Sequence, residues 1–568
     1  MSPSYLNPAS HHELKEIYYT QYDNGVANGT TLPFVYPMGS LGATIVLLFL
    51  LVPPRSIFHS QLTRYAAFGF IFSLHVFMIT NCKARNVEPA FGVGLICAWG
   101  VLWSAAILVF NDAKVDYKRI VRKAPVKQAV NIDMKDDTKW PHLQLSRTVS
   151  FKGSPPQNGR ISSSPSKINS KDAQTKRTGT LAWQIYPDSS FVERADWVVD
   201  LYSNFRGVAW NWKIPGLPTY PNSVQAQLQS SCGPGTLHSL KDFPTSRSGV
   251  CRFDTSRDLI LHNIWLFTKG YLIIDLVLTL MHYDPYFWGI MNRPPPAYFP
   301  VIIANYAVLI RAYRLVFSMT MVWMCLRTVF CLAPLFFVGV LGPTYIGIRG
   351  EPWMYPDHFG SYQHVFDRGL AGWWSSWWHS TFRSAFQAGA DWAVIKSGLH
   401  PKSMRGKALQ LFVAFSLSGC LHASGSMTMA GETWPWRGAF MFFFWQPVGI
   451  LLEMSWGIFL KQSGLQRKIP KPLGQAANFL WVHAWFLLTG PLIADDFARY
   501  YIFSYCYMNN RLLTSTIRGG LWLFEPFPVS LARLVGLGVE GDKFWCWNGR
   551  WAQWHTDKNR WWFSGIAL

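Results

Sequence analysis

Long runs of apolar residues recur along the 568-residue chain, and each is close to the length that crosses the hydrocarbon core of a bilayer. Inside a membrane a segment must satisfy its own backbone hydrogen bonds, so such runs form helices. We count eight to ten spans and predict an all-α polytopic membrane protein. The candidate runs are residues 33–52, 64–80, 91–110, 259–281, 299–318, 320–342, 407–430, 436–460, 475–494 and 499–524.

Charged residues make up only 15% of the chain, whereas a soluble domain has about 25%. Lysine and arginine number 52 against 31 acidic residues, a formal net charge of +21. The basic residues do not interleave into a nucleic-acid reader motif, so we expect no nucleic-acid partner and predict basic loops beside anionic lipid. The nine cysteines include no CxxC pair, and no His/Cys cluster has metal spacing, so we expect no metal site.

A long polar segment, residues 111–257, separates the third and fourth runs. Residues 111–180 hold fifteen Lys/Arg and six Asp/Glu, and the Ser/Pro-rich stretch 146–171 cannot bury enough apolar surface to fold. Basic residues also crowd just after the third run, which places this segment in the cytosol and the N-terminus in the lumen. Asn28, in the sequon Asn28-Gly29-Thr30, is then a candidate for N-glycosylation.

The first thirty residues lack the pattern of a cleavable signal peptide, so we expect the first span to target the chain to the endoplasmic reticulum. The predicted organisation is a polar N-terminal tail (1–32), N-terminal membrane helices (33–110), a basic disordered cytosolic loop (111–190), an ordered loop docked on the membrane domain (191–257), a membrane core (258–525) and a C-terminal tail (526–568).

The stretch "AGWWSSWWHSTFRSAF", residues 371–386, combines four tryptophans with one histidine and one arginine. In a helix, Trp374 and Trp378 share a side, and His379 and Arg383 lie one turn apart. We predict an interfacial or re-entrant helix with tryptophan at headgroup depth. A plain interfacial anchor with a snorkelling arginine is the alternative.

His422 lies in the middle of the apolar stretch "LFVAFSLSGCLHASGSM", among small residues that allow close helix approach. An ionisable side chain inside a span is costly and indicates function. Histidine titrates near neutral pH, so His422 is a candidate general base for a hydroxyl. A neutral imidazole bonded in a helix–helix contact is the alternative.

A third stretch, "WVHAWFLLTGPLIADDFARY", carries His483 and ends in Asp495 and Asp496. Capping of a helix end or solvation at the membrane interface explains the two aspartates as well as a functional role does. Glu453 and Arg311 also lie in apolar surroundings, and we entertain the hypothesis that they pair.

Hydrolase and nucleotide-binding motifs such as GxSxG, Walker A and GxGxxG after a strand do not occur. An embedded histidine without a metal suits acyl transfer from an activated donor, because a thioester already supplies the leaving group.

Three of these stretches resemble the fungal wax synthase-like branch of the membrane-bound O-acyltransferases. "SSWWHSTFRSAF" is similar to that branch's Trp-His signature, "SGCLHASG" to the stretch that holds the family's catalytic histidine, and "GPLIADDFAR" to its Pro-then-Asp stretch. "RGVAWNWKIPGLP" (206–218) resembles the segment before the fourth span, so the likeness covers about residues 190–500. Ser375 and Ser376 stand where the family usually has basic residues.

The resemblance implies an acyl-CoA-dependent O-acyltransferase with acyl-CoA as co-substrate and no permanently bound cofactor. It implies His422 as the base and His379 as the group that donates to, or polarises, the carbonyl oxygen. Arg383 would bind a donor phosphate or hold the Trp-His helix, and Arg405 and Lys407 are the alternative partners of the phosphates. It further implies that Trp374, Trp377 and Trp378 line the entry or the acyl site, with Trp374 and Trp378 as donor-binding residues. Asp495 and Asp496 are further candidates, as groups that orient a histidine.

The resemblance favours acetyl-CoA as donor and a terpenoid or other secondary-metabolite hydroxyl as acceptor. A wax ester synthase is the alternative. A multispan transporter with intramembrane His, Arg and Asp is a reading of another class. The expected partners are the bilayer and a hydrophobic alcohol, and the sequence leaves the oligomeric state open.

Overall fold

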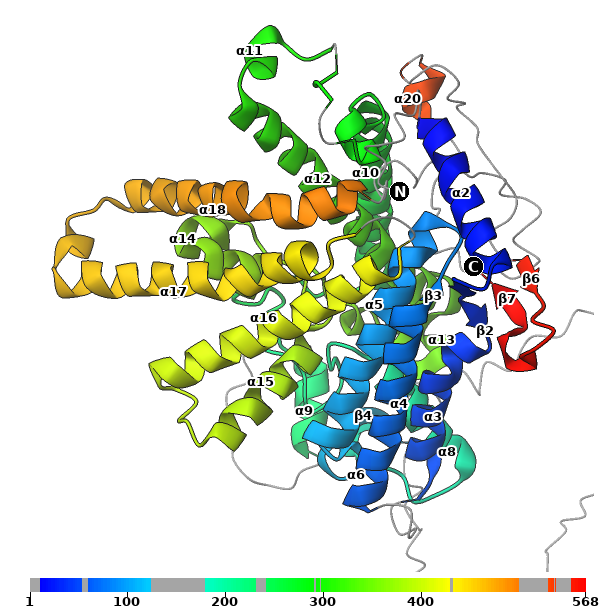
Figure 1. Cartoon of the computed structure of the whole chain (residues 1–568). Helices are drawn as coiled ribbons and strands as arrows, with labels where there is room; N and C mark the ends of the chain where they lie inside the picture. The colour runs from blue at the N-terminus through cyan, green and yellow to red at the C-terminus, as the bar shows by residue number, and fades with distance from the viewer. Residues whose placement is uncertain are drawn as a thin grey trace, which may run out of the picture.

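The computed structural model in Figure 1 describes residues 11–53, 60–123, 179–230, 242–290, 293–296, 298–429, 433–499, 530–535, 537 and 553–567. Within these ranges the chain is mainly helical, and seven helices are long and apolar enough to cross a membrane. The all-α polytopic fold is therefore confirmed, with fewer spans in the described residues than the eight to ten predicted. The seven spans are Gln61–Asn81, Pro89–Phe110, Ser256–Met281, Ala307–Gly350, Met404–Met427, Trp436–Gln462 and Lys471–Arg499.

Two predicted spans at 299–318 and 320–342 are one continuous helix, α12 (Ala307–Pro334), followed by the π-helical η4 (Leu335–Leu341). No glycine or proline interrupts α12 before Pro334, whose missing N–H precedes the widened turn. The predicted span at 33–52 is also wrong, because only α3 (Leu41–Leu51) is an α-helix there. The predicted span at 499–524 lies almost wholly outside the described residues.

Besides α12, long helices make up most of the other spans, and the other described elements are short or flank the spans. The long helices are α4 (Gln61–Asn81), α5 (Val87–Ala105), α10 (Ser256–Met281), α16 (Met404–Met427), α17 (Met441–Gln462) and α18 (Lys471–Arg499). The shorter helices are α2 (His11–Ala27), α6 (Ala113–Asp116), α8 (Phe191–Ser203), α9 (Asn222–Ser230), α11 (Val301–Ala304), α13 (Gly342–Ile346), α14 (Gln363–Gly372), α15 (Arg383–Ser397) and α20 (Leu531–Leu534). The 3-10 and π segments are η1 (Met38–Ser40), η2 (Ala106–Phe110), η3 (Pro285–Trp288), η5 (Gly347–Gly350), η6 (Pro352–Met354), η7 (Trp373–Trp377), η8 (Trp436–Phe440), η9 (Leu465–Arg467) and η11 (Trp561–Phe563). The strands are β1 (Leu32–Pro33), β2 (Val35–Tyr36), β3 (Cys82–Lys83), β4 (Arg119–Lys123), β5 (Thr180–Gln184), β6 (Gln553–His555) and β7 (Gly565–Ala567).

Helix α16 is the central element, because it packs against α5, α15 and α17, and Figure 1 shows α16, α17 and α18 fanning out from the same region. Its start is fixed by Ser403, whose hydroxyl accepts a hydrogen bond from the Gly406 amide at 3.0 Å. The preceding helix, α15, ends at Gly398 in the left-handed conformation that favours glycine. These two signals make α15 and α16 an antiparallel pair.

The small residues around His422 bring helices together, as the sequence indicates. A Cβ at Gly425 would lie 2.7 Å from the Phe91 ring of α5, and one at Gly94 would lie 2.0 Å from the Ser424 carbonyl oxygen. A Cβ at Gly419 would meet Phe440 at 2.8 Å. Helices α5 and η8 therefore approach α16 more closely than larger residues permit.

The segment after the third span is ordered at both of its ends. Strand β4 pairs antiparallel with β5, from Arg119 opposite Gln184 to Lys123 opposite Thr180, and the apolar side chains Ile120 and Leu181 are buried. The prediction of disorder for all of 111–190 is therefore wrong for 111–123 and 179–190. The stretch that carries most of the basic and serine residues, 124–178, lies outside the described residues.

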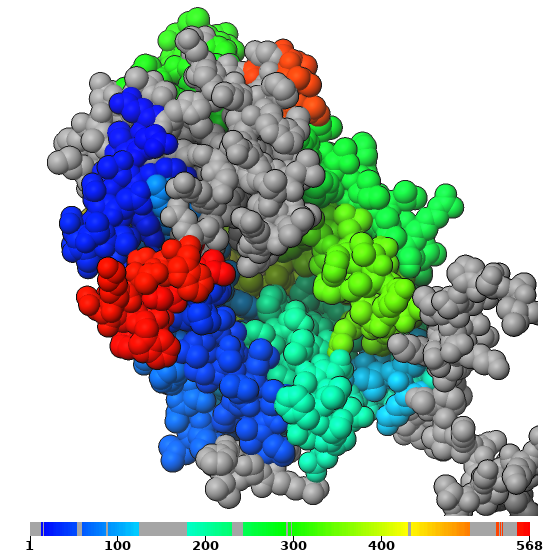
Figure 2. Space-filling model, turned by 90° about the vertical axis from the view of Figure 1, so that its right-hand side faces the viewer, coloured from blue at the N-terminus to red at the C-terminus, as the bar shows by residue number. Residues whose placement is uncertain are grey.

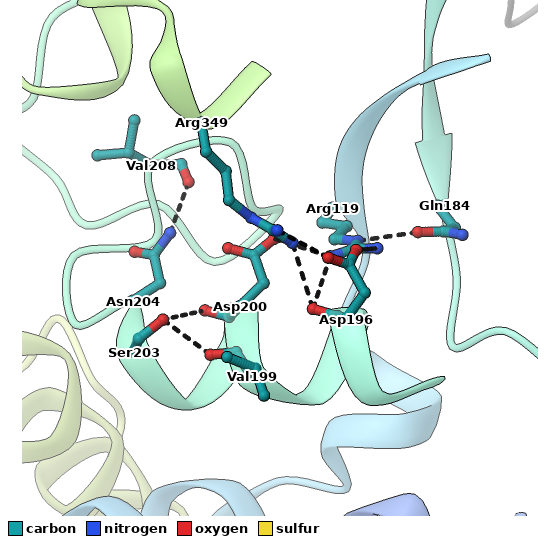
Figure 3. Close-up of polar contacts among 9 residues, drawn as sticks. All are labelled: Arg119, Gln184, Asp196, Val199, Asp200, Ser203, Asn204, Val208 and Arg349. Carbon is teal, nitrogen blue, oxygen red and sulfur yellow. Dashed lines mark hydrogen bonds and ion pairs between the residues drawn. The ribbon is translucent and has the colours of Figure 1, made fainter. Parts of the chain in front are cut away.

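An ion-pair network fastens this segment to the membrane domain, as Figure 3 shows. The buried Arg119 guanidinium donates to Asp196 at 2.6 Å and to Asp200 at 3.0 Å, both on α8, and to Gln184 at 2.8 Å. Arg349, in η5 at the end of the α12 span, reaches the same two carboxylates at 2.7 and 3.4 Å. Asp196 and Asp200, at the start of the predicted docked loop, are thus tied to the end of the α12 span.

Lys114, one of the basic residues after the third span, has a structural role. Its ammonium donates to the carbonyl oxygens of Phe49 at 3.0 Å and Val52 at 2.6 Å, at the C-terminal end of α3. The carbonyls at a helix C-terminus have no partner inside the helix and attract cations. Burial lowers the pKa of Lys114 to about 8.

The N-terminal tail and the C-terminal tail meet on one side of the molecule. Strand β2 pairs with β7, which pairs with β6, and Figure 2 shows the C-terminal segment lying against N-terminal segments. Residues 11–27 of the predicted polar tail form α2, which buries Leu14 and Tyr18. Asn28 is exposed just after this helix.

The sequon and the start of the basic segment lie at opposite ends of α4. Tyr22 of α2 donates to the carbonyl oxygen of Lys83, just after α4 ends, whereas Arg64 at the start of α4 pairs with Asp112 at 3.2 Å. The orientation of the chain, with a lumenal N-terminus and a cytosolic basic segment, stays a prediction.

Candidate active site

A cavity of about 560 Å³ lies between α15, α16, α17 and the Trp-rich segment, within the range of about 300–1,000 Å³ of small-molecule sites. One stripe of α16 lines it, from Lys407 to His422, a length of about 22 Å at 1.5 Å per residue. Facing this stripe is one side of α15, from Arg383 to Asp391. The cavity is thus elongated, with the histidine region at one end and exposed Lys407 at the other.

The Trp-rich segment is not the single helix predicted from the sequence. Its π-helical turn η7 ends at Trp377, Trp378 has an extended backbone, and α15 begins only at Arg383. His379 and Arg383 are therefore not neighbours on one helical face. Trp373 and Trp377 are only 6% and 5% exposed, so this segment is held inside the protein and is not a simple interfacial anchor.

The break nevertheless brings the predicted residues together. Trp374, Trp378, His379 and Arg383 all line the same cavity as His422, from separate segments of the chain. Two sequence motifs therefore supply five proposed residues that line one cavity.

One ring nitrogen of His422 is held by a hydrogen bond, and the other is available to accept a proton. Its Nδ1 lies 2.8 Å from the Ser418 carbonyl oxygen, which can only accept, so Nδ1 carries the ring proton and Nε2 carries the lone pair. The ring stacks on Phe443 of α17 with centroids 4.3 Å apart. A neutral imidazole held in this tautomer is able to accept a proton at Nε2.

His379 is held by aromatic rings rather than by hydrogen bonds. The rings of Phe330, Phe359, Trp378 and Phe382 have centroids 5.3 to 5.9 Å from its own, and its buried Nδ1 has no hydrogen-bond partner in the described residues. Burial, followed by the neighbouring His422, Arg383 and Arg206, lowers the pKa of His379 to about 3. The ring is neutral at physiological pH and can donate from one nitrogen without carrying charge.

Arg383 holds the wall of the cavity in place. Its Nη2 donates to the Trp374 carbonyl oxygen at 3.0 Å, a group freed by the break after η7. Pro215, from the docked 206–218 segment, lines the cavity beside it, and a Cβ on Gly216 would be 3.9 Å from the guanidinium. Burial lowers the pKa of Arg383.

Asp495 and Asp496 lie elsewhere. Asp495 accepts a hydrogen bond from the Tyr286 hydroxyl at 2.7 Å, and the buried Asp496 accepts one from the Trp434 amide at 2.8 Å. Neither lines the cavity. Helix α18, which carries both, packs on η3 and η8, so the bonds of these aspartates join α18 to neighbouring elements.

The sequence interpretation missed one polar residue of α17, Gln446, and assigned a different partner to another, Glu453. Glu453 does not pair with Arg311 but accepts a hydrogen bond from the Leu370 amide at 2.7 Å. The fully buried Gln446 accepts from the indole of Trp374 at 3.2 Å. A polar residue in the apolar run "MFFFWQPVGILLEM" was the available signal for Gln446.

His358 is a further histidine that the sequence did not single out. It stacks on Phe330 with centroids 4.0 Å apart, and Phe330 also contacts His379. Its Nδ1 lies 3.2 Å from the Thr381 hydroxyl. Burial, followed by Arg206 and His379, lowers the pKa of His358 well below its ordinary value.

Metal-ligand groups of three or more His, Cys, Asp or Glu side chains do not occur in the part of the chain that the structure describes. Polar residues that line the cavity and suit an anionic or amide-bearing ligand include Arg383, Gln387, Lys407 and Gln410.

Comparison with known protein families finds one match, in which residues 355–445 match the membrane bound O-acyl transferase family. This range includes the Trp-rich segment, α15 and α16, and therefore His379, Arg383 and His422. Neither curated proteins nor solved structures give a match. The family match, placed over the cavity of a multi-pass all-α protein, supports the membrane-bound O-acyltransferase superfamily for this chain.

Proposed function

We propose that the chain transfers an acyl group from acyl-CoA to the hydroxyl of a hydrophobic alcohol. The observation that carries this proposal is the single cavity that holds His422, with Nε2 as its free ring nitrogen, together with His379. A base and a neutral hydrogen-bond donor are the two groups that acyl transfer from a thioester needs.

In the proposed reaction, Nε2 of His422 takes the proton of the alcohol as its oxygen attacks the thioester carbonyl carbon. His379 donates a hydrogen bond to the carbonyl oxygen as it gains negative charge. The tetrahedral intermediate collapses when the carbon–sulfur bond breaks, and the proton on His422 passes to the departing thiolate. The products are an ester and free CoA, and His422 returns to its neutral form.

The donor is proposed to enter along α15 and α16. Lys407 at the rim and the nearby exposed Arg405 suit its phosphates, and about 22 Å of α16 separates this rim from His422. Arg383 is bound to the Trp374 carbonyl, so its main role in this proposal is to hold the wall.

For the substrates, we favour acetyl-CoA and a terpenoid or other secondary-metabolite alcohol, as in the wax synthase-like branch. The mainly apolar cavity lining suits such an acceptor. Wax ester synthesis from a long-chain alcohol and a fatty acyl-CoA is the second candidate. The proposed location is the endoplasmic reticulum membrane, with Asn28 as an N-glycan site in the lumen.

The test is an assay of microsomes that contain the protein, with labelled acetyl-CoA or palmitoyl-CoA and a panel of terpenoid and fatty alcohols. Wild type is expected to form ester and free CoA in equal amounts, and His422→Ala to form neither. His483→Ala is the matched control, because His483 makes the same bond to the carbonyl four residues earlier but does not line the cavity.

Full activity of His422→Ala at equal protein level would disprove the assignment of the base. Movement of an alcohol or anion across sealed vesicles, without ester or CoA release, would instead favour the transporter.

A further inference from the structure

We propose that Gln446 and Glu453 of α17 are positioning residues that hold Trp374 as the size-determining wall of the acceptor subsite. This inference rests on the proposed acyl transfer and adds where the hydrocarbon body of the alcohol lies. The subsite is the α17 side of the cavity, lined by Trp374, Phe415, Ile450 and Met454.

The two sides of the cavity differ in chemistry. Along α15 and the outer part of α16, the lining includes Arg383, Gln387, Asp391, Lys407 and Gln410. The described α17 residues that line the cavity, Phe443, Ile450 and Met454, are apolar or aromatic. Trp374, Phe415, Ile450 and Met454 belong to one hydrophobic cluster. A polar donor fits the first side, so the second remains for hydrocarbon.

The α17 side also adjoins the base. The ring of Phe443, which belongs to α17, stacks on His422 and lies 5.9 Å from Trp374, centroid to centroid. The substrate group beside His422 must be the hydroxyl that loses its proton. Because an acetyl group needs little space, the hydrocarbon on this side belongs to the alcohol.

Gln446 fixes the indole of Trp374. Its Oε1 accepts from the indole N–H groups of Trp374 at 3.2 Å and Trp485 at 3.3 Å, and its Nε2 donates to the Phe442 carbonyl at 2.8 Å. Gln446 is 0% exposed, and a buried amide in an apolar span is costly unless such bonds are made. These bonds leave Trp374 little freedom to rotate.

Glu453 fixes the backbone that carries Trp374. Its carboxylate accepts from the Leu370 amide at 2.7 Å, directly after Gly369, whose φ is +56°. A Cβ at Gly369 would lie 2.5 Å from Glu453 Oε2. The left-handed glycine and the carboxylate together set where the chain turns into η7, and therefore how far Trp374 reaches into the cavity.

The experiment compares kcat/KM for a bulky and a small alcohol with one donor in wild type and in variants. The variants are Trp374→Ala, Trp374→Phe, Gln446→Met, Trp374→Phe combined with Gln446→Met, Glu453→Gln and Glu453→Ala. Trp456→Phe is the matched control, because Trp456 is 61% exposed on the same helix and does not line the cavity. Donor KM and the preference for donor chain length are measured in parallel.

We expect Trp374→Ala to raise the ratio of kcat/KM for the bulky alcohol to kcat/KM for the small one about tenfold. This is the scale on which apolar pockets discriminate by size. Gln446→Met should shift the ratio in the same direction, and Trp374→Phe combined with Gln446→Met should shift it no more than either change alone. Glu453→Gln retains one acceptor oxygen and should keep the wild-type ratio of kcat/KM values. Glu453→Ala removes the acceptor and should change this ratio. Donor KM should stay within about twofold.

An unchanged ratio in Trp374→Phe and Gln446→Met, with normal activity on the small alcohol, overturns the inference. So does a change in donor chain-length preference alone, because it would place the acyl chain on the α17 side. If the wild type forms no ester from any pair of substrates, the proposed function itself fails, a result distinct from normal turnover with unmoved selectivity.

Discussion

The Nδ1 atom of His422 lies 2.8 Å from the carbonyl oxygen of Ser418, one turn earlier on α16. His75 and His483 make the same contact with their own preceding turns, at 2.9 and 2.7 Å. The bond fixes the tautomer in all three cases and so does not by itself indicate catalysis. His422 differs because it alone of these three lines the cavity with His379.

The two histidines of the cavity should act as a unit. We expect His422→Gln to lower kcat by about 10²- to 10⁴-fold, the usual contribution of a positioned base, and His379→Gln to lower it less. The double variant should be little slower than His422→Gln, because the carbonyl donor has no role once attack is blocked. Steady-state kinetics of the four proteins measures this, and fully additive losses would show independent roles.

Protein stability should fall as the pH is lowered below 6.5, in part through His379. The pKa of His379 is about 3 in the folded chain, whereas it is near 6.5 when unfolded, so the unfolded state binds more protons between these values. Between pH 7.5 and 5.5 the loss is about 1.4 kcal/mol for this one group. Thermal unfolding in detergent should show a smaller pH dependence for His379→Gln than for wild type. An identical dependence in both would contradict the lowered pKa.

Lys114→Met should destabilise the protein by about 1.5–3 kcal/mol, because two carbonyls at the end of α3 lose a charged donor. Lys118→Met is the control, since Lys118 is exposed and should change stability by less than about 0.5 kcal/mol. Chemical unfolding in micelles compares the two. Equal effects would mean that the cation is not used at the helix end.

Arg119→Met should cost about 1.5–3 kcal/mol, because Asp196 and Asp200 lose a buried charged donor and keep Arg349 alone. Arg349→Met should cost less, since Arg349 is more exposed and Arg119 would still hold both acids. Unfolding midpoints of the two variants and of their combination measure the coupling. A larger loss for Arg349→Met would reverse the assigned order.

Deletion of residues 141–176 should leave transfer activity intact. The β4–β5 ladder, which ends at Lys123 opposite Thr180, keeps all of its pairs in this variant. A deletion that continues to residue 184 removes β5 and should lower the unfolding midpoint. Loss of turnover in the shorter deletion, with an unchanged unfolding midpoint, would show that the removed residues take part in the reaction.

The sequence by itself determined the helical membrane class and the identity of the polar residues most costly to embed. An apolar segment of spanning length forms a helix, and a histidine or arginine in apolar surroundings is costly to bury. His379, Arg383 and His422 were therefore identifiable without coordinates. The same argument did not decide between a structural and a functional role for Asp495 and Asp496, because a carboxylate at a helix end has many partners available to it.

Only the tertiary structure decided how these residues meet. Helical periodicity predicted one helix through His379 and Arg383, but the backbone of Trp378 is extended and α15 begins only at Arg383. Likewise, burial of Ile120 and Leu181 ordered two strands that local composition marked as disordered. Contacts between residues far apart in the chain outweigh local preference, and such contacts are not encoded in any one window of sequence.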